Sequence, residues 1–452
     1  MSKPTVRALA PAQSFTVGIA LFSMFFGAGN LIIPPLLAYQ AGSATPVAML
    51  GFLVAAIGFP VLGIIAVALA GTARELAGRV HPRFAEVFVG AVYLSIGPCL
   101  AIPRTSSTAF EMLVPLLPAG LSVDTARLVF SIAFFACAFL LSLRPGVITR
   151  VLGRITGPAL IALIVLVVGS AVVAPMGEPG APVAPYDGAA AVQGFLTGYQ
   201  TMDLLASLAF GIVIAESVHE LGVTDAGGVA REISRAGVVA GALMALIYGG
   251  LALVGAGMGS VAPGLTNGAA ILTASATAHF GVLGTAVVAL IFFLACFNVC
   301  IGLISCCARY FCESYAPGGA DGGDGSPTRA FCVLAFVFAA FSCVLSNVGL
   351  DAILAFSVPL LNALYPVAIV LVLMGLAHCF CDAHRPAWVW TGVAVAIAGV
   401  AVSVRDAFAP GVWLPLDALP LADIGMSWLP VAVVAFAAGL ACDLIVSHSK
   451  AR

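Results

Sequence analysis

Apolar segments alternate with short polar stretches along the whole chain. Each apolar segment is roughly 17–28 residues long, close to the ~20 residues with which a helix crosses a bilayer and unlike the ~10-residue alternating strands of a membrane barrel. The pattern therefore predicts an all-α integral membrane protein with twelve transmembrane helices. We number these spans 1 to 12 and place them at residues 14–38, 46–70, 84–112, 126–143, 153–175, 193–218, 236–258, 280–308, 330–346, 350–377, 387–404 and 426–446.

The segments between the spans are short, which predicts a single transmembrane domain over residues 1–452. A Gly/Asp-rich insert at 317–328 has the composition of a flexible linker. With a cytoplasmic N-terminus, most of the 18 lysine and arginine residues fall in cytoplasmic segments, as the positive-inside rule requires. Both termini are therefore predicted to be cytoplasmic, and the first span has no signal-peptide cleavage site, so we expect it to be retained.

Composition excludes several classes of protein. The chain is 62% hydrophobic and 8% charged, with a mean hydropathy of +1.14, which is far from the balance of a soluble domain. A net charge of −2 gives no basis for binding nucleic acid. The 12 cysteines lie mostly in apolar segments, where they pack as small side chains, and predict no disulfide framework. We find no phosphate-binding loop, nucleophile elbow or HExxH motif, so neither ATP use, an organic cofactor nor an enzyme activity is expected.

Span 1 is interrupted by the stretch SMFFGAGNLIIPP at 23–35. Glycine costs a helix about 1 kcal/mol relative to alanine, and freed backbone groups find no water in lipid, so such a break persists where it lines a cavity. An unwound segment exposes amides that attract an anion and carbonyls that attract a cation. Gly27, Gly29 and Asn30 therefore indicate a site for a zwitterion beside a cation. The alternative is that the glycines only permit close helix packing.

Span 6 carries a second set of polar and small residues in mid-membrane. They are Asp203, Ser207 and the pair Phe210-Gly211, which echoes Phe26-Gly27 in span 1. Two interrupted helices five spans apart are typical of transporters built from inverted repeats. We therefore expect spans 1 and 6 to be discontinuous. The expected units are two inverted five-helix repeats and two additional helices, at 14–175, 193–377 and 387–446.

Asp203 is the most informative carboxylate, because an ionisable group inside a span costs at least about 2.5–3.5 kcal/mol and must face protein or water. Arg104 in span 3 lies at a similar predicted depth. One interpretation is a structural ion pair between Arg104 and Asp203 that joins span 3 to span 6. The others are that Asp203 takes part in cation or proton coupling, or that it makes the pocket polar.

Two further spans offer candidate residues. In span 3, Gly97-Pro98 interrupts the helix close to several hydroxyls, which either line a cavity or bond to the preceding turn. In span 8, Asn298 is the only amide, and it should face the interior because an unpaired amide in hydrocarbon is costly. A cluster near the end of span 10 has the residue types of a metal site but irregular spacing, so we interpret it as a turn at the membrane surface. Its members are His378, Cys379, Cys381, Asp382 and His384.

Several motifs resemble, in the same order, those of the branched-chain amino acid:cation symporters, also called branched-chain amino acid transport system II carrier proteins. The resemblance covers almost the whole chain. Its motifs are FFGAGNLIIPPLLAYQAG at 25–42, VYLSIGPCLAIPRTSS at 92–107, GYQTMDLLASLAFGIVI at 198–214, NGAAIL at 267–272, LSNVGL at 345–350, SVPLLNALYP at 357–366 and LPLADIGMSWL at 419–429. That family belongs to the amino acid–polyamine–cation superfamily, whose leucine-transporter-like fold is an inverted five-plus-five repeat with two added helices.

The resemblance implies uptake of leucine, isoleucine and valine by alternating access, usually with sodium, in a bacterial cytoplasmic membrane and without an ATP-binding subunit. By that analogy the amides of Ala28 and Gly29 hold the substrate carboxylate, while Ser207 and Phe210 contact the amino group and the side chain. The expected substrate site comprises Gly27, Ala28, Gly29, Asn30, Gly97, Ser207, Phe210 and Gly211.

The same resemblance suggests where the coupling cation binds. By the same analogy carbonyls of Ser23 and Phe26 help to bind sodium, with Asn298 and Asp203 as further candidates. The family tends to carry adjacent threonines in span 8, where this chain has Asn298 and Val299. An asparagine oxygen can ligate a hard cation and a valine cannot, so sodium and protons both stay open.

Two other functions also stay open. One is a symporter of the same fold for another neutral amino acid, such as alanine or an aromatic one. The other is a membrane-embedded sensor or enzyme, which should show a catalytic constellation or an appended soluble domain.

Overall fold

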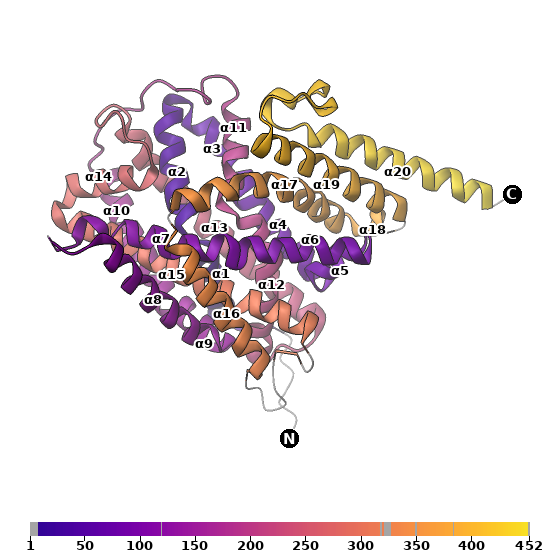
Figure 1. Ribbon diagram of the computed structural model, residues 1–452, viewed down its shortest axis with the longest axis horizontal. Helices are drawn as coiled ribbons and strands as arrows, with labels where there is room; N and C mark the ends of the chain where they lie inside the picture. Colours follow the sequence, from indigo (N-terminus) through magenta and orange to yellow (C-terminus); the bar gives the residue numbers. More distant parts are fainter. Residues whose placement is uncertain are drawn as a thin grey trace.

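The structure is a computed structural model, and it describes residues 8–118, 120–316, 319–320, 327–348, 350–382 and 384–450. Across these residues the chain forms helices and no β-strand. Of the predicted linker 317–328, only residues 319–320 and 327–328 are described. The helices pack into one bundle, with α19 (Arg385–Phe408) and α20 (Trp428–Lys450) side by side along one edge (Figure 1).

The helices overlap all the predicted spans, because a helix satisfies its own backbone hydrogen bonds in an apolar medium. Most ends agree to within a few residues, but the helix of span 7 begins at Ala226 instead of residue 236, and that of span 8 ends at Tyr315 instead of residue 308. For spans 1 to 6 they are α1 (Pro11–Phe25) and α2 (Ala28–Ala41), α3 (Thr45–Leu53) and α4 (Phe59–Ala70), α6 (Pro82–Leu94) and α7 (Ala101–Glu111), α8 (Val123–Ser142), α9 (Pro145–Val151) and α10 (Gly157–Val173), and α11 (Ala190–Gly198) and α12 (Asp203–Glu220). For spans 7 to 12 they are α13 (Ala226–Met258), α15 (Val282–Tyr315), α16 (Arg329–Ser346), α17 (Leu350–Leu376), α19 and α20.

Shorter helices lie between these. The α-helical ones are α5 (Ala73–Gly78), α14 (Gly268–Phe280) and α18 (His378–Cys381), and the 3-10 turns are η1 (Gly42–Ala44), η4 (Val114–Leu116), η6 (Tyr199–Thr201), η7 (Pro415–Ala418) and η8 (Ala422–Ile424). The sequence patterns did not predict α14, which is too short to cross a bilayer. The side chain of Asn267 caps it by accepting a hydrogen bond of 2.8 Å from the amide of Ala270.

The protein is a multi-pass membrane protein. By length and composition, nine helices in the described residues can cross a membrane, or ten if one bent pair counts as a span. One of the nine is the continuous stretch Ala28–Ala70 of 43 residues. Gly42 turns the chain within it with a φ of 50°, a conformation that favours glycine. Pro11–Phe25 and Trp428–Asp443 are shorter apolar helices, so the number of twelve crossings stays a prediction.

Both predicted discontinuities are present. Span 1 breaks between α1 and α2, at Phe26 and Gly27. Span 6 breaks at Met202, which adopts a left-handed conformation with a φ of 66°, and its two halves meet at 41°. The pair Phe210-Gly211 lies inside the regular helix α12, so its similarity to Phe26-Gly27 does not mark a break. Asp203 is therefore the first residue of the second half-helix.

Three other predicted spans contain a turn of π-helix. These turns are η2 (Val54–Gly58), η3 (Ser95–Cys99) and η5 (Leu152–Thr156), in spans 2, 3 and 5. In η3 the backbone of Gly97 leaves the helical region (φ −90°, ψ −129°), next to Pro98, which has no amide hydrogen to donate. Single π turns inside membrane helices frequently accompany functional sites, and η3 lies directly before α7, which carries Arg104.

Helices α3 and α11 approach so closely that glycine is required at their contact. A Cβ added at Gly51 would overlap the backbone carbonyl of Ala191, and one added at Gly194 would overlap the carbonyl of Ala48. Small residues permit such backbone approach in membrane helices. The contact holds α11, and with it the break at Met202, against the start of span 2.

Gly51→Ala should destabilise the protein by about 1–3 kcal/mol, because the new methyl group meets backbone atoms that cannot rotate away. We expect a lower melting temperature in detergent and a smaller monodisperse yield. Gly169→Ala is the matched control, since nothing lies within 4 Å of an added Cβ at that position on α10, and alanine favours a helix. Equal melting temperatures for the two variants would contradict the packing described.

The predicted surface turn after span 10 ties the last helices together. The imidazole of His384 lies 2.7 Å from the carboxylate of Asp443 on α20, and the guanidinium of Arg79 lies 3.1 Å from the carboxylate of Asp382. Beyond α19, Arg405 pairs with Asp417 in the following loop. A hydrogen bond from the Leu414 amide, and then the Arg405 guanidinium, lower the pKa of the Asp417 carboxyl.

Candidate functional site

The break in span 1 exposes backbone groups of both signs. The helical ladder ends where the amide of Phe26 donates to the carbonyl of Phe22 (2.8 Å) and resumes where the amide of Leu31 donates to the carbonyl of Gly27 (3.3 Å). The amide of Gly27 donates to the side-chain oxygen of Asn30 (3.2 Å), which fixes the turn. Carbonyls of residues 23–26 thus lie outside the ladder at the negative end of α1, and amides of residues 28–30 begin the positive end of α2.

A small cavity of about 50 Å³, here called the central cavity, lies between the two breaks. Backbone and side chains from α1, α2, α7, α12 and α15 surround it. Its lining residues are Met24, Phe25, Gly27, Ala28, Gly29, Asn30, Ile96, Ala101, Arg104, Thr105, Thr201, Met202, Asp203, Ala206, Phe210, Val299 and Leu303. The cavity therefore combines a helix N-terminus, one guanidinium and one carboxylate with an apolar wall of Met, Phe, Ile, Val and Leu side chains.

Asp203 joins three helices at this cavity. One of its carboxylate oxygens accepts hydrogen bonds from the amide nitrogen of Asn30 (2.6 Å) and from the hydroxyl of Tyr248 (3.2 Å), and the Asn30 amide also bonds to Tyr248. The backbone amide of Asp203 donates to the hydroxyl of Thr201 (3.4 Å). The carboxylate is 98% buried by this arrangement, and α2, α12 and α13 are connected through it.

The ion pair predicted between Arg104 and Asp203 does not form. Among the described residues the guanidinium of Arg104 makes no ion pair within 4.0 Å and no hydrogen bond, although it interacts electrostatically with Asp203. The physical reason is that the side chains within hydrogen-bond reach of the Asp203 carboxylate are those of Asn30 and Tyr248, which stabilise it in place of the guanidinium. The depth predicted from sequence correctly indicated that the two charges line the same cavity, but it could not show which side chains contact Asp203.

The structure brings together most of the predicted substrate residues. Gly27, Ala28, Gly29, Asn30 and Phe210 line the central cavity with Asp203. Three do not. The hydroxyl of Ser207 donates to the carbonyl of Leu204 (2.6 Å) and faces Gly63. Gly211 lines a different cavity, and an added Cβ at Gly97 would lie 2.8 Å from the thiol of Cys307.

Of the candidate cation ligands, Asn298 has the most informative surroundings. Its side chain is 0% exposed, and neither its amide oxygen nor its amide nitrogen has a hydrogen-bond partner in the described part of the chain. Gly302, four residues on and therefore on the same face of α15, packs against Met24 at the end of α1. The hydroxyl of Ser23 donates to the carbonyl of Leu152 (3.4 Å), and the ring of Phe26 stacks on Phe22.

Tyr248 is the functional residue that the sequence patterns missed. Its ring is completely buried, and it packs against Phe26 and Phe52 at centroid distances of 6.0 Å and 5.3 Å. A signal was present, since a lone tyrosine in the middle of an apolar span must find a partner for its hydroxyl. Without the fold, nothing indicated that this partner is Asp203.

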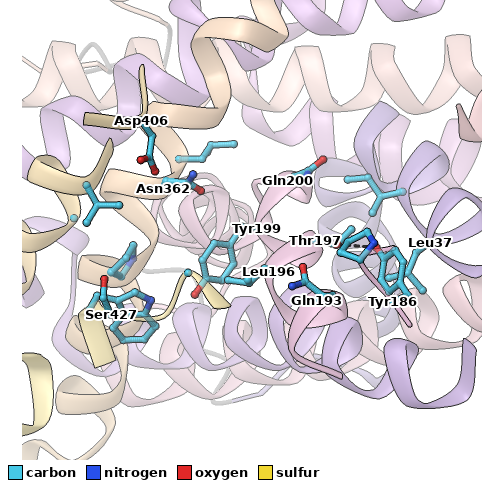
Figure 2. Close-up of a pocket in the computed structure, with 18 of the residues that line it drawn as sticks. Leu37, Tyr186, Gln193, Leu196, Thr197, Tyr199, Gln200, Asn362, Asp406 and Ser427 are labelled. Atoms are coloured by element: carbon cyan, nitrogen blue, oxygen red, sulfur yellow. Dashed lines mark hydrogen bonds between the residues drawn. The ribbon is translucent and has the colours of Figure 1, made fainter. Parts of the chain in front are cut away.

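Two larger cavities lie beyond the central one. The first, of about 430 Å³, extends among α2, α11, α17, α19 and α20; Figure 2 shows Asp406, Asn362 and Ser427 at one end, Gln193 and Thr197 at the other, and Tyr199 between them. The turn Tyr199–Thr201 separates it from the central cavity, and Tyr365 stacks on Tyr199 at 4.5 Å. We call it the α19-side cavity.

The second, also about 430 Å³, lies among α4, α12, α13 and the end of α15, and we call it the α13-side cavity. Gly211 lines it, whereas the preceding Phe210 lines the central cavity and contacts the ring of Phe25 edge-on at 5.2 Å. An ion pair of 2.9 Å between Arg309 and Glu216 lies on its wall.

The fold is that of a known class of membrane transporters. The structure of Mhp1, a nucleobase-cation-symport-1 family transporter in a closed conformation with bromovinylhydantoin bound, superposes with a TM-score of 0.58 at 13% sequence identity, over 98% of this chain and 96% of that one. Two broken helices around a small polar cavity are the architecture of such secondary transporters.

The chain belongs to the family described as branched-chain amino acid transport protein, whose profile matches residues 11–446. Relatives include the branched-chain amino acid permease BraB of Bacillus subtilis, 35% identical over 98% of each chain, and the branched-chain amino acid transport system 3 carrier protein of Pseudomonas aeruginosa, 36% identical over 97% of each. The branched-chain amino acid permease BrnQ of Escherichia coli K12 is 34% identical over 92% of each chain. The protein is thus a transporter-family member and not an enzyme.

Proposed function

We propose that the protein takes up leucine, isoleucine and valine by secondary active transport, coupled to a cation. The observation that carries this proposal is the central cavity, where a helix N-terminus, the guanidinium of Arg104 and the buried carboxylate of Asp203 face an apolar wall. A zwitterion with a branched aliphatic side chain needs these features together. The relatives agree with the proposal, since they are branched-chain amino acid permeases and carriers.

In the proposed complex the amides of Ala28 and Gly29 bind the substrate carboxylate, as anions bind at helix N-termini. The aliphatic side chain lies against Phe210, Ile96 and Leu303 on the apolar wall. One methylene in such a wall is worth only about 1–3 kcal/mol, so we expect weak discrimination among leucine, isoleucine and valine.

The proposed coupling cation lies beside the end of α1. Carbonyls of Ser23 and Phe26 are outside the helical ladder, and the buried amide of Asn298 has an oxygen without a partner among the described residues. Carbonyl and amide oxygens are ligands for a hard cation such as Na⁺. Proton coupling through the buried carboxylate of Asp203 is the alternative, and it would need no site at Asn298.

Alternating access is supported by the order of the cavities. The central cavity lies between the α19-side and α13-side cavities, behind the Tyr199–Thr201 turn on one side and Phe210 on the other. In the predicted topology, with two inverted repeats and cytoplasmic termini in a bacterial inner membrane, the α19-side cavity faces outward. Opening either barrier would then connect the central cavity to one side of the membrane.

Uptake of labelled leucine into proteoliposomes tests this proposal. With an imposed sodium gradient we expect accumulation, and excess unlabelled isoleucine or valine should abolish it while excess alanine or phenylalanine should not. Replacing sodium by choline should lower the rate at least about tenfold if Na⁺ occupies the proposed site.

The possible outcomes separate the parts of the proposal. Full activity in choline would exclude sodium coupling and leave a proton gradient as the driving force. Competition by alanine alone would assign the carrier to another neutral amino acid. Absence of accumulation under both gradients would contradict secondary transport of leucine.

A further inference from the structure

Arg104 is a membrane-embedded cation whose guanidinium contacts no anion directly in the described part of the chain. It lies on α7 and lines the central cavity, yet its side chain makes no ion pair within 4.0 Å and no hydrogen bond among the described residues. A guanidinium carries five donors and stays charged, so leaving it unpaired in an apolar region is costly. An arrangement of this kind is stable when a ligand completes it.

The surroundings of Arg104 add to its positive charge. One guanidinium nitrogen, Nη2, would lie 2.7 Å from a Cβ added at Gly29, so it lies directly beside the first turn of α2. The amides that begin α2 form the positive end of that helix. Arg104 interacts electrostatically with Cys296, Asp203 and Tyr365, and Asp203 accepts hydrogen bonds from Asn30 and Tyr248.

We propose that Arg104 and the first amides of α2 form a carboxylate-binding subsite, in which the guanidinium binds the carboxylate of the transported amino acid. This inference rests on the proposed function and assigns to the site a charge that backbone amides alone do not supply. A guanidinium binds a carboxylate through two parallel hydrogen bonds, which fixes the orientation of the ligand as well as its charge.

The subsite also explains why the cavity holds one charge of each sign. With the ligand carboxylate at Arg104, the opposite charge of the zwitterion is left for Asp203, whose second carboxylate oxygen is not used by Asn30 or Tyr248. Ligands that lack the carboxylate would leave Arg104 unpaired, so the subsite selects amino acids against the corresponding amines and amides.

Binding of leucine and of leucinamide to purified protein tests this subsite, because the two ligands differ only in the carboxylate. Wild-type protein should bind leucine at least about 30-fold more tightly than leucinamide. Arg104→Gln should weaken leucine binding by at least about 30-fold and change leucinamide binding less than about threefold. Arg104→Lys keeps the charge but not the fork of donors, so its affinity for leucine should lie between those of the wild type and Arg104→Gln.

Arg127→Gln is the matched control, since Arg127 on α8 pairs with Glu111 away from the cavity; both affinities should match the wild type. The subsite would be overturned if Arg104→Gln lost affinity for leucine and leucinamide equally, or if its affinity for leucine were unchanged. Recovery of leucine binding in the double variant R104Q/D203N would also overturn it, by showing that Arg104 only neutralises Asp203.

Failure of the proposed function gives a different result. If wild-type protein binds no leucine, the assignment of substrate is wrong, and the same comparison with alanine and alaninamide then tests the subsite. If Arg104→Gln binds the amino acid and its amide with equal affinity, the subsite is supported for either substrate. If the variant keeps the wild-type preference for the amino acid, the subsite is overturned.

Discussion

Asp203→Asn should lower leucine uptake by on the order of 100-fold while the protein still folds. The variant keeps the shape of the side chain but removes the charge that accepts hydrogen bonds from Asn30 and Tyr248. It also removes the one carboxylate that lines the central cavity beside Arg104. Initial rates of uptake in proteoliposomes, measured from pH 5 to pH 8, give the size of the loss.

Asp443→Asn serves as the control, because it removes the carboxylate from the pair with His384 at the edge of the bundle. We expect its uptake within about twofold of wild type. A wild-type rate and pH profile in Asp203→Asn would exclude both proton coupling through Asp203 and its role in binding. Size-exclusion profiles of both variants identify any loss that comes from misfolding.

Gly29→Val should reduce leucine uptake and leucine binding to about 1% of wild type. A Cβ at this position would lie 2.7 Å from Nη2 of Arg104 and 3.3 Å from the carbonyl oxygen of Gln200, so the valine displaces both walls of the proposed carboxylate position. A displacement of about 1 Å in such a site is enough for a 100-fold loss. Binding of labelled leucine to purified protein distinguishes a loss of affinity from a defect in opening the cavity.

Gly90→Val on α6 is the control for the added side chain, since nothing lies within 4 Å of a Cβ at that position. It should transport at the wild-type rate. Near-normal binding by Gly29→Val would place the substrate away from the first turn of α2.

Most helix ends were predictable from sequence to within a few residues, because only a long apolar segment can lie in a bilayer and its length is set by the bilayer. The start of α13 at Ala226 and the end of α15 at Tyr315 were not, since these ends continue beyond the apolar segments. The break in span 1 was also predictable, since Gly27, Gly29 and Asn30 all disfavour a continuous helix. Helix α14 was not, because 13 residues that lie against the bundle carry no transmembrane signal.

Two features of the site depend on contacts between distant segments and were therefore not predictable. The break in span 6 falls at Met202, a residue with no intrinsic preference for the left-handed conformation that it adopts. The partner of Asp203 is Tyr248 and not Arg104, which follows from how α13 packs against α2 and α12. Polarity identified the charged residues of the cavity, while the packing of the helices decided which side chains reach the Asp203 carboxylate.

The glycine contact between α3 and α11 has a mechanical consequence. Because the backbones of α3 and α11 touch at Gly51 and Gly194, the two helices form one tightly packed unit. The π turn Val54–Gly58 follows α3 and the left-handed Met202 follows α11, and both lie at the same end of this unit, where an added Cβ at Gly198 would meet Ala55. Because Asp203 follows Met202 directly, a ligand that binds this carboxylate acts on the chain at the junction between this unit and α12.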